Sequence, residues 1–191
     1  MMMQKCVIPA LVGIIPVLLF ALTDSTVQEQ PPYDIVMFYN TSQPIITYYT
    51  TGGKDMCKDD IKINITNQDI YLLRGFKSWW MPPTLLYGLF CGNTSYKPST
   101  CNSMKLTSTN DTSFPPRNGT RWNSQETLFF ATNDFVCGVF RVDLFSNGGR
   151  TGIYEVRVRN AYKMDEIAQQ CLNYTSVHFS GENFTDCKKF K

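Results

Sequence analysis

The sequence has little of what catalysis and metal binding usually require. His178 is the only histidine among 191 residues, and no Cys-x-x-Cys pair accompanies it. No nucleophile motif surrounds it, and Gly148 and Gly149 read as part of a hairpin turn, not of a phosphate-binding loop. A general base, a zinc site and a nucleotide cradle therefore lack their residues. We expect no enzyme, no cofactor and no metal.

The sequence also lacks a large excess of charge of either sign. The formal net charge of +2 at pH 7 gives no field that would attract nucleic acid. No long Ser/Gly linker and no internal repeat divides the chain, and its length is typical of one domain that can bury a sizeable core.

The N-terminus carries a targeting pattern. Lys5 precedes an apolar run from Cys6 to Leu22, and polar residues follow. This order is typical of a secretory signal peptide, whereas two prolines and a barely sufficient apolar length disfavour a membrane anchor. We predict a signal peptide at residues 1–22, a single domain at 23–191 and an extracellular protein with no membrane attachment. The cleavage point stays open between Leu22 and Val27.

Asparagine acceptors agree with export. Seven asparagines stand two residues before Ser or Thr with no proline between: Asn40, Asn64, Asn93, Asn110, Asn118, Asn173 and Asn183. Such positions predict a glycoprotein and place these residues on the surface.

Cysteine usage points the same way. With Cys6 in the predicted signal peptide, six of the seven cysteines remain: Cys57, Cys91, Cys101, Cys137, Cys171 and Cys187. In an oxidising compartment, six cysteines imply three disulfides, chosen from fifteen possible pairings.

Short strands separated by turns fill the mature chain. They are expected at residues 44–50, 57–65, 69–75, 84–91, 104–108 and 126–131, and in a hairpin that runs from 135–145 through the turn 147–150 to 152–160. A helix should follow from Met164. In the second strand, alternation assigns Ile61, Ile63 and Ile65 to the buried face and Asp60, Lys62 and Asn64 to the wet face.

About eight strands followed by one helix favour a closed barrel, because closure removes exposed strand edges. An immunoglobulin-like sandwich is the main alternative, since such domains place a core tryptophan between paired cysteines. Trp79, Trp80 and Trp122 do lie between Cys57 and Cys137.

The stretch from Cys137 to Cys187 resembles the tick salivary lipocalins, the histamine-binding family. That family commonly shows Cys-Asp-Val, then Glu-Leu-Trp or Glu-Leu-Tyr, then Cys. Here the positions read Cys137-Gly138-Val139, Glu155-Val156-Arg157 and Cys171. The resemblance implies an all-β fold: an eight-stranded antiparallel lipocalin-like barrel with one C-terminal α-helix packed outside.

The resemblance also implies the disulfides and the biology. The pairs would be Cys137 with Cys171, Cys57 with Cys187 and, for the remaining two cysteines, Cys91 with Cys101. The protein would be a monomeric salivary scavenger that takes a small mediator into a barrel pocket and thereby counters host defence.

Two departures from the motif bear on the ligand. In the amine-binding relatives, the aspartate and the glutamate are the anionic partners of a protonated amine. Only Glu155 remains here, because Gly138 has no carboxylate, and Arg157 replaces a usual aromatic ring. A site with one carboxylate and one guanidinium would no longer favour a small cation. We therefore expect a lipid such as a fatty acid or leukotriene to be slightly preferred over histamine or serotonin.

Other readings stay open. Glu155 and Arg157 could form a solvent-facing pair, with Tyr154, Val156 and Val158 facing the interior. The chain could instead be a protein-binding lipocalin that inhibits a host complement, coagulation or immune factor. Four aromatic residues on strands near apolar runs are further candidates for lining a pocket: Tyr48, Tyr71, Tyr87 and Phe129.

Overall fold

A computed structural model describes residues 33–77, 82–91, 101–110, 112, 121–145, 149, 152–159 and 164–190. The predicted signal peptide, most of the predicted turn at 147–150, Trp79, Trp80 and the acceptors Asn93 and Asn118 lie outside the described residues.

The described elements follow the predicted order closely. They are α1 (Ile35–Tyr39), β1 (Ile45–Thr50), η1 (Lys54–Met56), β2 (Lys58–Ile65), β3 (Asp69–Phe76), β4 (Thr84–Phe90), β5 (Ser103–Ser108), β6 (Ser124–Ala131), β7 (Cys137–Leu144), β8 (Ile153–Arg159), α2 (Met164–His178), β9 (Thr185–Asp186) and η4 (Cys187–Lys189). Each predicted strand and the late helix are confirmed to within a few residues. The two-residue strand β9 and the short helix α1 were not predicted.

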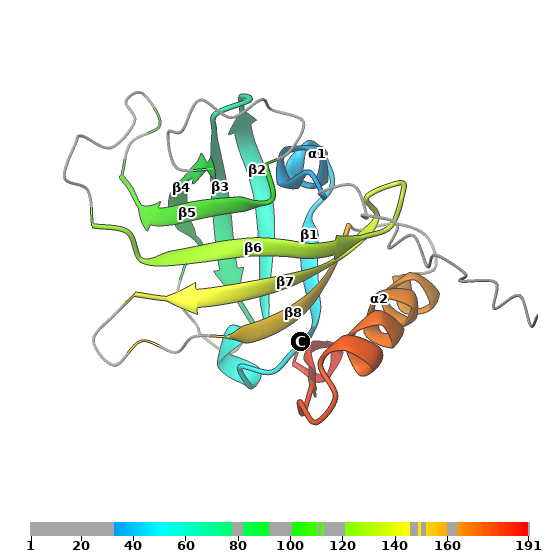
Figure 1. The fold of residues 1–191 in the computed structure, drawn as a ribbon. Coiled ribbons are helices and arrows are strands. Elements are labelled where there is room, and N and C mark those ends of the chain that lie inside the picture. The colour runs from blue at the N-terminus through cyan, green and yellow to red at the C-terminus, as the bar shows by residue number, and fades with distance from the viewer. Residues whose placement is uncertain are drawn as a thin grey trace, which may run out of the picture. The chain divides into compact units, whose positions relative to one another are not determined.

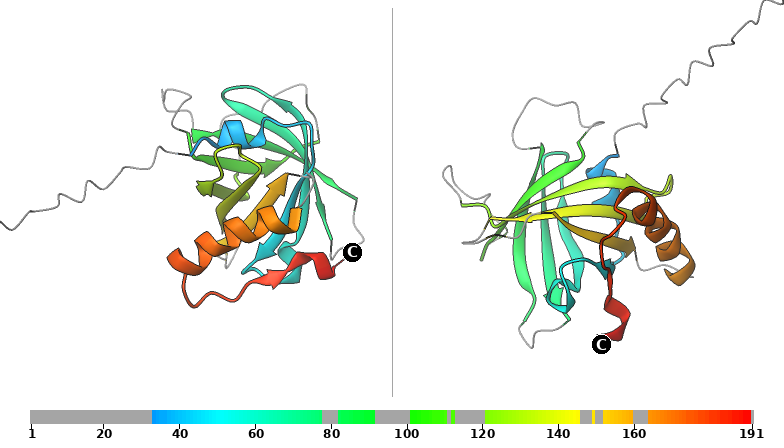
Figure 2. Two further views of the ribbon diagram at one scale, coloured as in Figure 1. Left: turned by 90° about the vertical axis from the view of Figure 1, so that its right-hand side faces the viewer. Right: turned by 60° about the horizontal axis from the view of Figure 1, so that its bottom comes forward.

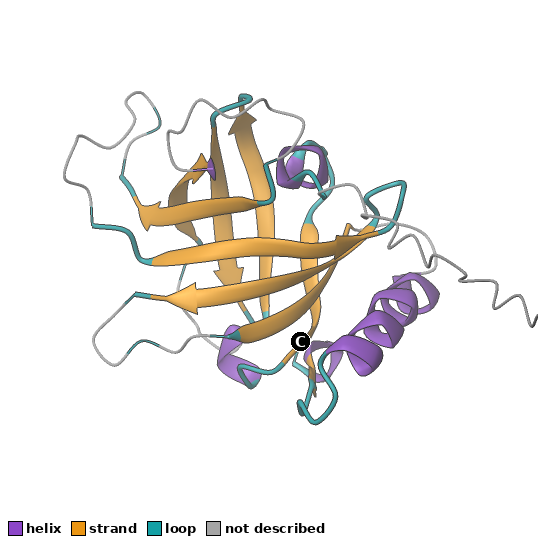
Figure 3. Ribbon diagram, viewed as in Figure 1, coloured by secondary structure: helices purple, strands orange, loops and turns teal. Residues whose placement is uncertain are grey.

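Strands β1 to β8 form one antiparallel barrel, in which each strand pairs with the next along the chain (Figures 1 and 3). Strand β1 pairs with β8, and it closes the barrel by pairing with β2 through Ile45↔Asp60 and Ile46↔Asp59. Strand β9 adds to β1 through Tyr49↔Asp186 and Thr50↔Thr185. The predicted closed barrel is confirmed, and the immunoglobulin-like alternative is wrong.

Helix α2 packs against the outside of the barrel (Figure 2). Its buried residues Ala168 and Cys171 join an apolar cluster with Val139, Val156 and Val158, whose side chains leave the outer faces of β7 and β8. This position of the helix confirms the prediction. Within the described ranges, no helix combines the length and apolar character that a membrane span requires.

Helix α1 closes one end of the barrel interior. Asp34 caps its N-terminus by accepting hydrogen bonds from the amides of Val36 and Met37 at 2.8 and 3.2 Å. Side chains of Phe38 and Tyr39 are fully buried in the cluster that fills the barrel. Because strands alternate direction, β1, β3, β5 and β7 end, and β2, β4, β6 and β8 begin, at the opposite end of the barrel.

The inward face of β2 differs from the prediction. Ile61 and Ile63 are each 48% exposed, whereas Lys58 and Asp60 are buried. Alternation identifies two faces of a strand but not which of them points inward. The charged face turns inward here because partners for its charges come from other strands.

Three disulfides are present: Cys57–Cys187, Cys91–Cys101 and Cys137–Cys171. These are the pairs that the resemblance implies. Cys57–Cys187 joins the start of β2 to the C-terminal η4 segment, and Cys137–Cys171 joins β7 to α2. Both therefore attach segments outside the barrel to its wall.

Candidate functional site

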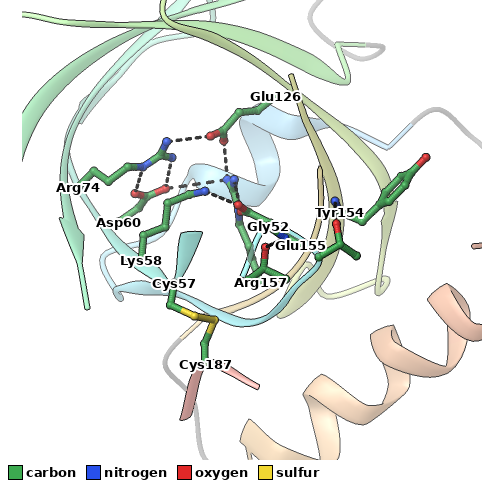
Figure 4. Close-up of polar contacts among 12 residues, drawn as sticks. Gly52, Cys57, Lys58, Asp60, Arg74, Glu126, Tyr154, Glu155, Arg157 and Cys187 are labelled. Carbon is green, nitrogen blue, oxygen red and sulfur yellow. Dashed lines mark hydrogen bonds and ion pairs between the residues drawn. A yellow bond between two sulfur atoms is a disulfide. The ribbon is translucent and has the colours of Figure 1, made fainter. Parts of the chain in front are cut away.

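Six charged side chains meet inside the barrel and form what we call the buried ion network: Lys58, Asp60, Arg74, Glu126, Glu155 and Arg157. They come from β2, β3, β6 and β8, and Figure 4 shows them directed toward one another. Three are cations and three are carboxylates. The network is therefore neutral overall when all six are ionised.

Glu155 lies between two cations. Its Oε1 is 2.5 Å from Lys58 Nζ, and its Oε2 accepts a hydrogen bond from Arg157 Nε at 2.8 Å. Lys58 stands at the first position of β2, directly after the β1–β2 connection. Its backbone therefore lies toward the end of the barrel that faces away from α1.

Glu126 joins the two arginines. Arg157 Nη1 donates to its Oε2 at 2.5 Å, and Arg74 Nη1 donates to its Oε1 at 2.8 Å. Arg74 also grips Asp60 with two hydrogen bonds of 2.7 Å, from Nε and Nη2. Asp60 and Arg74 are cross-strand partners in the β2–β3 register, so this bidentate pair follows from the pairing.

Two aromatic residues, Tyr39 of α1 and Phe140 of β7, complete the network. The Tyr39 hydroxyl accepts from Arg157 Nη1 at 2.5 Å and donates toward Glu126 Oε2 at 3.2 Å. The guanidinium of Arg157 also lies over the Phe140 ring, 4.4 Å from its centroid. Arg157 is held by contacts from α1, β6, β7 and its own strand.

Burial and the neighbouring opposite charges shift the pKa values of these groups in opposite directions. Burial alone would raise the pKa of Glu126, but Arg157 and Arg74 hold that pKa well below its ordinary value. Burial likewise opposes the charged form of Arg157, yet Glu126 and Glu155 raise its pKa. Lys58 is the exception, because burial outweighs Glu155 and lowers its pKa to about 8. Lys58 is therefore the member that changes charge near physiological pH.

The two departures from the family motif are neighbours in space. Gly138 is the cross-strand partner of Arg157 in the β7–β8 register. A Cβ on Gly138 would lie 2.8 Å from the Phe38 ring and 3.0 Å from Leu128. The space that an aspartate would need is filled by α1, so this position leaves no room for a second anionic partner.

Glu155 and Arg157 both face the interior and are fully buried, so the solvent-facing alternative for this pair is wrong. Val156 and Val158 point the other way and pack beneath α2. Which side of β8 faced inward was undecided from the sequence.

The four aromatic candidates do not lie in the cluster that fills the barrel. Tyr48 packs in the outer cluster beneath α2, and Phe129 contacts the rings of Tyr154 and Phe179 near the end of that helix. Tyr71 and Tyr87 contact each other at a centroid distance of 5.2 Å. Ile70, Leu72 and Arg74 occupy the inward positions of β3, so alternation turns Tyr71 outward.

The predicted acceptors within the described ranges are exposed. They are Asn40, Asn64, Asn110, Asn173 and Asn183. His178 stacks on Tyr174 at the end of α2, with ring centroids 4.1 Å apart. Among the described residues, no group of three or more His, Cys, Asp or Glu side chains is arranged to hold a metal ion.

Sequence reasoning missed Tyr39, Lys58, Asp60, Arg74 and Glu126. One signal was present: opposite charges recur at a spacing of two residues in Lys58-x-Asp60 and in Glu155-x-Arg157. Such spacing puts each pair on one strand face. Two strands with this pattern could have indicated a shared polar interior.

No family model matches the sequence, and no curated protein matches it. Solved structures do match. The crystal structure of AM182 in complex with serotonin aligns with a TM-score of 0.52 at 14% identity, covering 83% of this chain and 91% of AM182. Lobster apocrustacyanin A1 aligns with a TM-score of 0.48 at 10% identity, covering 78% of this chain and 76% of its own. The likeness to AM182 concerns the fold alone, which is lipocalin-like.

Proposed function

We propose that this chain is a secreted lipocalin that binds a small molecule inside its barrel, and that the ligand carries a carboxylate, as a fatty acid or leukotriene does. The carrying observation is an excess of buried donors. Arg157 Nη2 lies 2.6 Å from Glu155 Oε2, yet no acceptor among the described residues is in hydrogen-bonding geometry with it. A buried donor whose ion-pair partner is poorly aligned forgoes part of a hydrogen bond, so a better-aligned incoming acceptor would be stabilised there.

Lys58 supplies the second donor. An ammonium group has three N–H donors, and Lys58 makes one hydrogen bond, to Glu155, within the described part of the chain. A ligand carboxylate near Glu155 could accept from both Lys58 and Arg157. Charge-assisted hydrogen bonds of this kind contribute about 1.5–3 kcal/mol each.

The rest of the network would remain in place as a scaffold. Asp60 is held by two hydrogen bonds from Arg74, and Glu126 is shared by Arg74 and Arg157. Lys58 has a single partner and sits at the barrel end opposite α1. It is the residue whose movement would admit a polar head group.

Two further observations support the proposal. The apolar N-terminal run and three disulfides fit an extracellular protein. AM182, which shares the fold, forms a complex with serotonin. A small molecule can therefore occupy a protein of this architecture, although serotonin is an amine and the donor excess here favours an acid.

A second function is favoured by one observation. Every side chain of the buried ion network is at most 7% exposed, so the interior is closed to solvent. A sealed interior suits a lipocalin that acts through its outer surface on a host protein. The small-ligand proposal requires the network to open on binding.

Binding experiments on the secreted, glycosylated protein separate these cases. Native mass spectrometry would be recorded with histamine, serotonin, a leukotriene and oleic acid, for the wild type and for Lys58→Met and Glu155→Gln. Lys188→Met is the matched control, because it removes a partly exposed lysine that lies outside the network and is paired with Asp165. A carboxylate ligand should bind about tenfold to a hundredfold more weakly to Lys58→Met, and its binding should survive Glu155→Gln.

The opposite pattern would overturn the choice of ligand. Amine binding that is lost in Glu155→Gln and kept in Lys58→Met would mean that a carboxylate of the network holds a cation. No adduct with any member of the panel would reject a pocket role and leave the protein-binding function.

A further inference from the structure

The barrel closes along only part of β2. Pairing with β1 is limited to Asp59 and Asp60, and β2 continues beyond the start of β1 (Figure 1). Beyond this pairing, β1 is covered by β9, which pairs with Tyr49 and Thr50. Residues 61–65 of β2 have β3 as their only strand partner among the described residues. Open strand edges of this kind pair readily with other chains.

This open edge is apolar. Ile61 and Ile63 are each 48% exposed, and both are β-branched residues suited to strand pairing. The edge carries two devices that natural proteins use against association: a charged residue, Lys62, and a register shift between Lys62 and Asn64. Neither device covers the isoleucine side chains.

Two glycan acceptors flank the same edge. Asn64 belongs to the edge itself, is exposed and begins the triplet Asn-Ile-Thr. Asn40 follows α1, is exposed and begins the triplet Asn-Thr-Ser. The side-chain Oδ1 of Asn40 accepts from Lys62 Nζ at 3.2 Å, so its amide nitrogen remains available for modification.

We propose that Asn40 and Asn64 both carry N-linked glycans, and that these glycans cover the open edge of β2 and keep the protein monomeric. In the modification, the side-chain amide nitrogen bonds to C1 of an oligosaccharide donated by a lipid-linked diphosphate. The C1–O bond to the diphosphate breaks, the amide loses one proton, and the lipid diphosphate leaves. The five edge residues span about 13 Å, a length that two branched oligosaccharides can shield.

The inference rests on the secretory route of the proposed function and not on the ligand. Its test compares Asn40→Gln/Asn64→Gln with Asn173→Gln/Asn183→Gln, all made in a secreting eukaryotic cell. The control pair also removes two exposed acceptors, but from α2 and the segment after it. Glycopeptide mass spectrometry gives the occupancy of each site, and light scattering after size exclusion gives the mass across a concentration series.

The Asn40/Asn64 variant should form dimers or larger species while the control stays monomeric. Adding Ile61→Lys and Ile63→Lys to it should restore the monomer. If the variant is not secreted, the wild type can be deglycosylated natively by peptide N-glycosidase, which removes the glycans of every acceptor and leaves aspartate at each site. Ile61→Lys/Ile63→Lys is treated in parallel, and association that this variant does not show is assigned to the open edge.

Three outcomes would overturn the inference. In the first, Asn40 or Asn64 is unmodified while Asn173 or Asn183 is occupied. In the second, the two double variants associate to the same extent. In the third, the protein without glycans at the open edge remains monomeric. Absence of glycans from every acceptor would instead reject the secretory route, and with it the premise shared with the proposed function.

Discussion

Lys58 makes the free energy of unfolding depend on pH in a direction opposite to that of an ordinary ion-paired lysine, whose pKa is raised on folding. Burial, partly offset by Glu155, lowers its pKa from 10.5 to about 8 in the folded state. Below pH 8 the lysine is protonated in both states, so the folded protein bears the full penalty of a buried charge. Between pH 8 and 10.5 only the unfolded chain holds the proton, and stability therefore rises with pH.

The size of the effect follows from the shift. Each pKa unit corresponds to about 1.4 kcal/mol, so the whole window contributes on the order of 3 kcal/mol and the part up to pH 9.5 about 2 kcal/mol. For a domain of this length, about 2 kcal/mol raises Tm by about 6 °C. Above pH 10 the trend reverses, because burial raises the pKa of Tyr39 and the unfolded chain loses the phenol proton first.

Thermal unfolding followed by circular dichroism at pH 7, 8, 9 and 9.5, with the disulfides intact, measures the rise. Lys58→Met keeps most of the length of the buried side chain and removes the titrating group, so its profile should be flat over this window. Lys188→Met should keep the rise of the wild type. A wild-type Tm that stays constant or falls, or an equal rise in Lys58→Met, would refute the reasoning.

Three further substitutions test the packing around the network. Glu126→Gln leaves two buried guanidinium groups short of a counter-charge and should lower the unfolding free energy in urea by about 3–5 kcal/mol, against less than about 1 for an exposed carboxylate of α2. Gly138→Ala should lower the free energy of unfolding by about 1–3 kcal/mol, because the new Cβ would lie 2.8 Å from the Phe38 ring. Gly75→Ala, whose Cβ would lie 3.9 Å from its nearest neighbour, should change this free energy little. Equal losses in the two variants would contradict the placement of Gly138. Replacing Cys57 and Cys187 together by alanine should cost about 5 kcal/mol in the chain-entropy model, since the bridge spans 130 residues, and an unchanged urea midpoint would speak against it.

Local patterns predicted the fold well. The hairpin β7–β8 was predicted from two strand-like runs on either side of a glycine-containing turn, and α2 as a helical stretch from Met164; both lie where expected. Helix α1 was missed because its five residues are too few to show helical periodicity. The two-residue strand β9 has no periodicity either.

The candidate site was less predictable, because its contacts join distant parts of the chain. Arg157 contacts Tyr39 across 118 residues and Glu126 across 31. No local rule assigns such partners. Nor could the inward turn of Lys58 and Asp60 be read from β2, since a buried charge is acceptable only when its counter-charge is present. Glu155 and Arg157 were identified through the family resemblance, and the structure gives them partners that the motif does not mention.

Closure of the barrel by segments from both ends of the sequence also affects how the protein is made. Strand β1 lies early in the chain, yet its two edges are completed by β8 and by β9, and Cys57 pairs with Cys187 only a few residues from the last one. During synthesis β1 must therefore wait for these partners until residues 153–186 have been produced. Contacts so remote in sequence also make folding slow. Until closure, unpaired strand edges make the chain prone to aggregation.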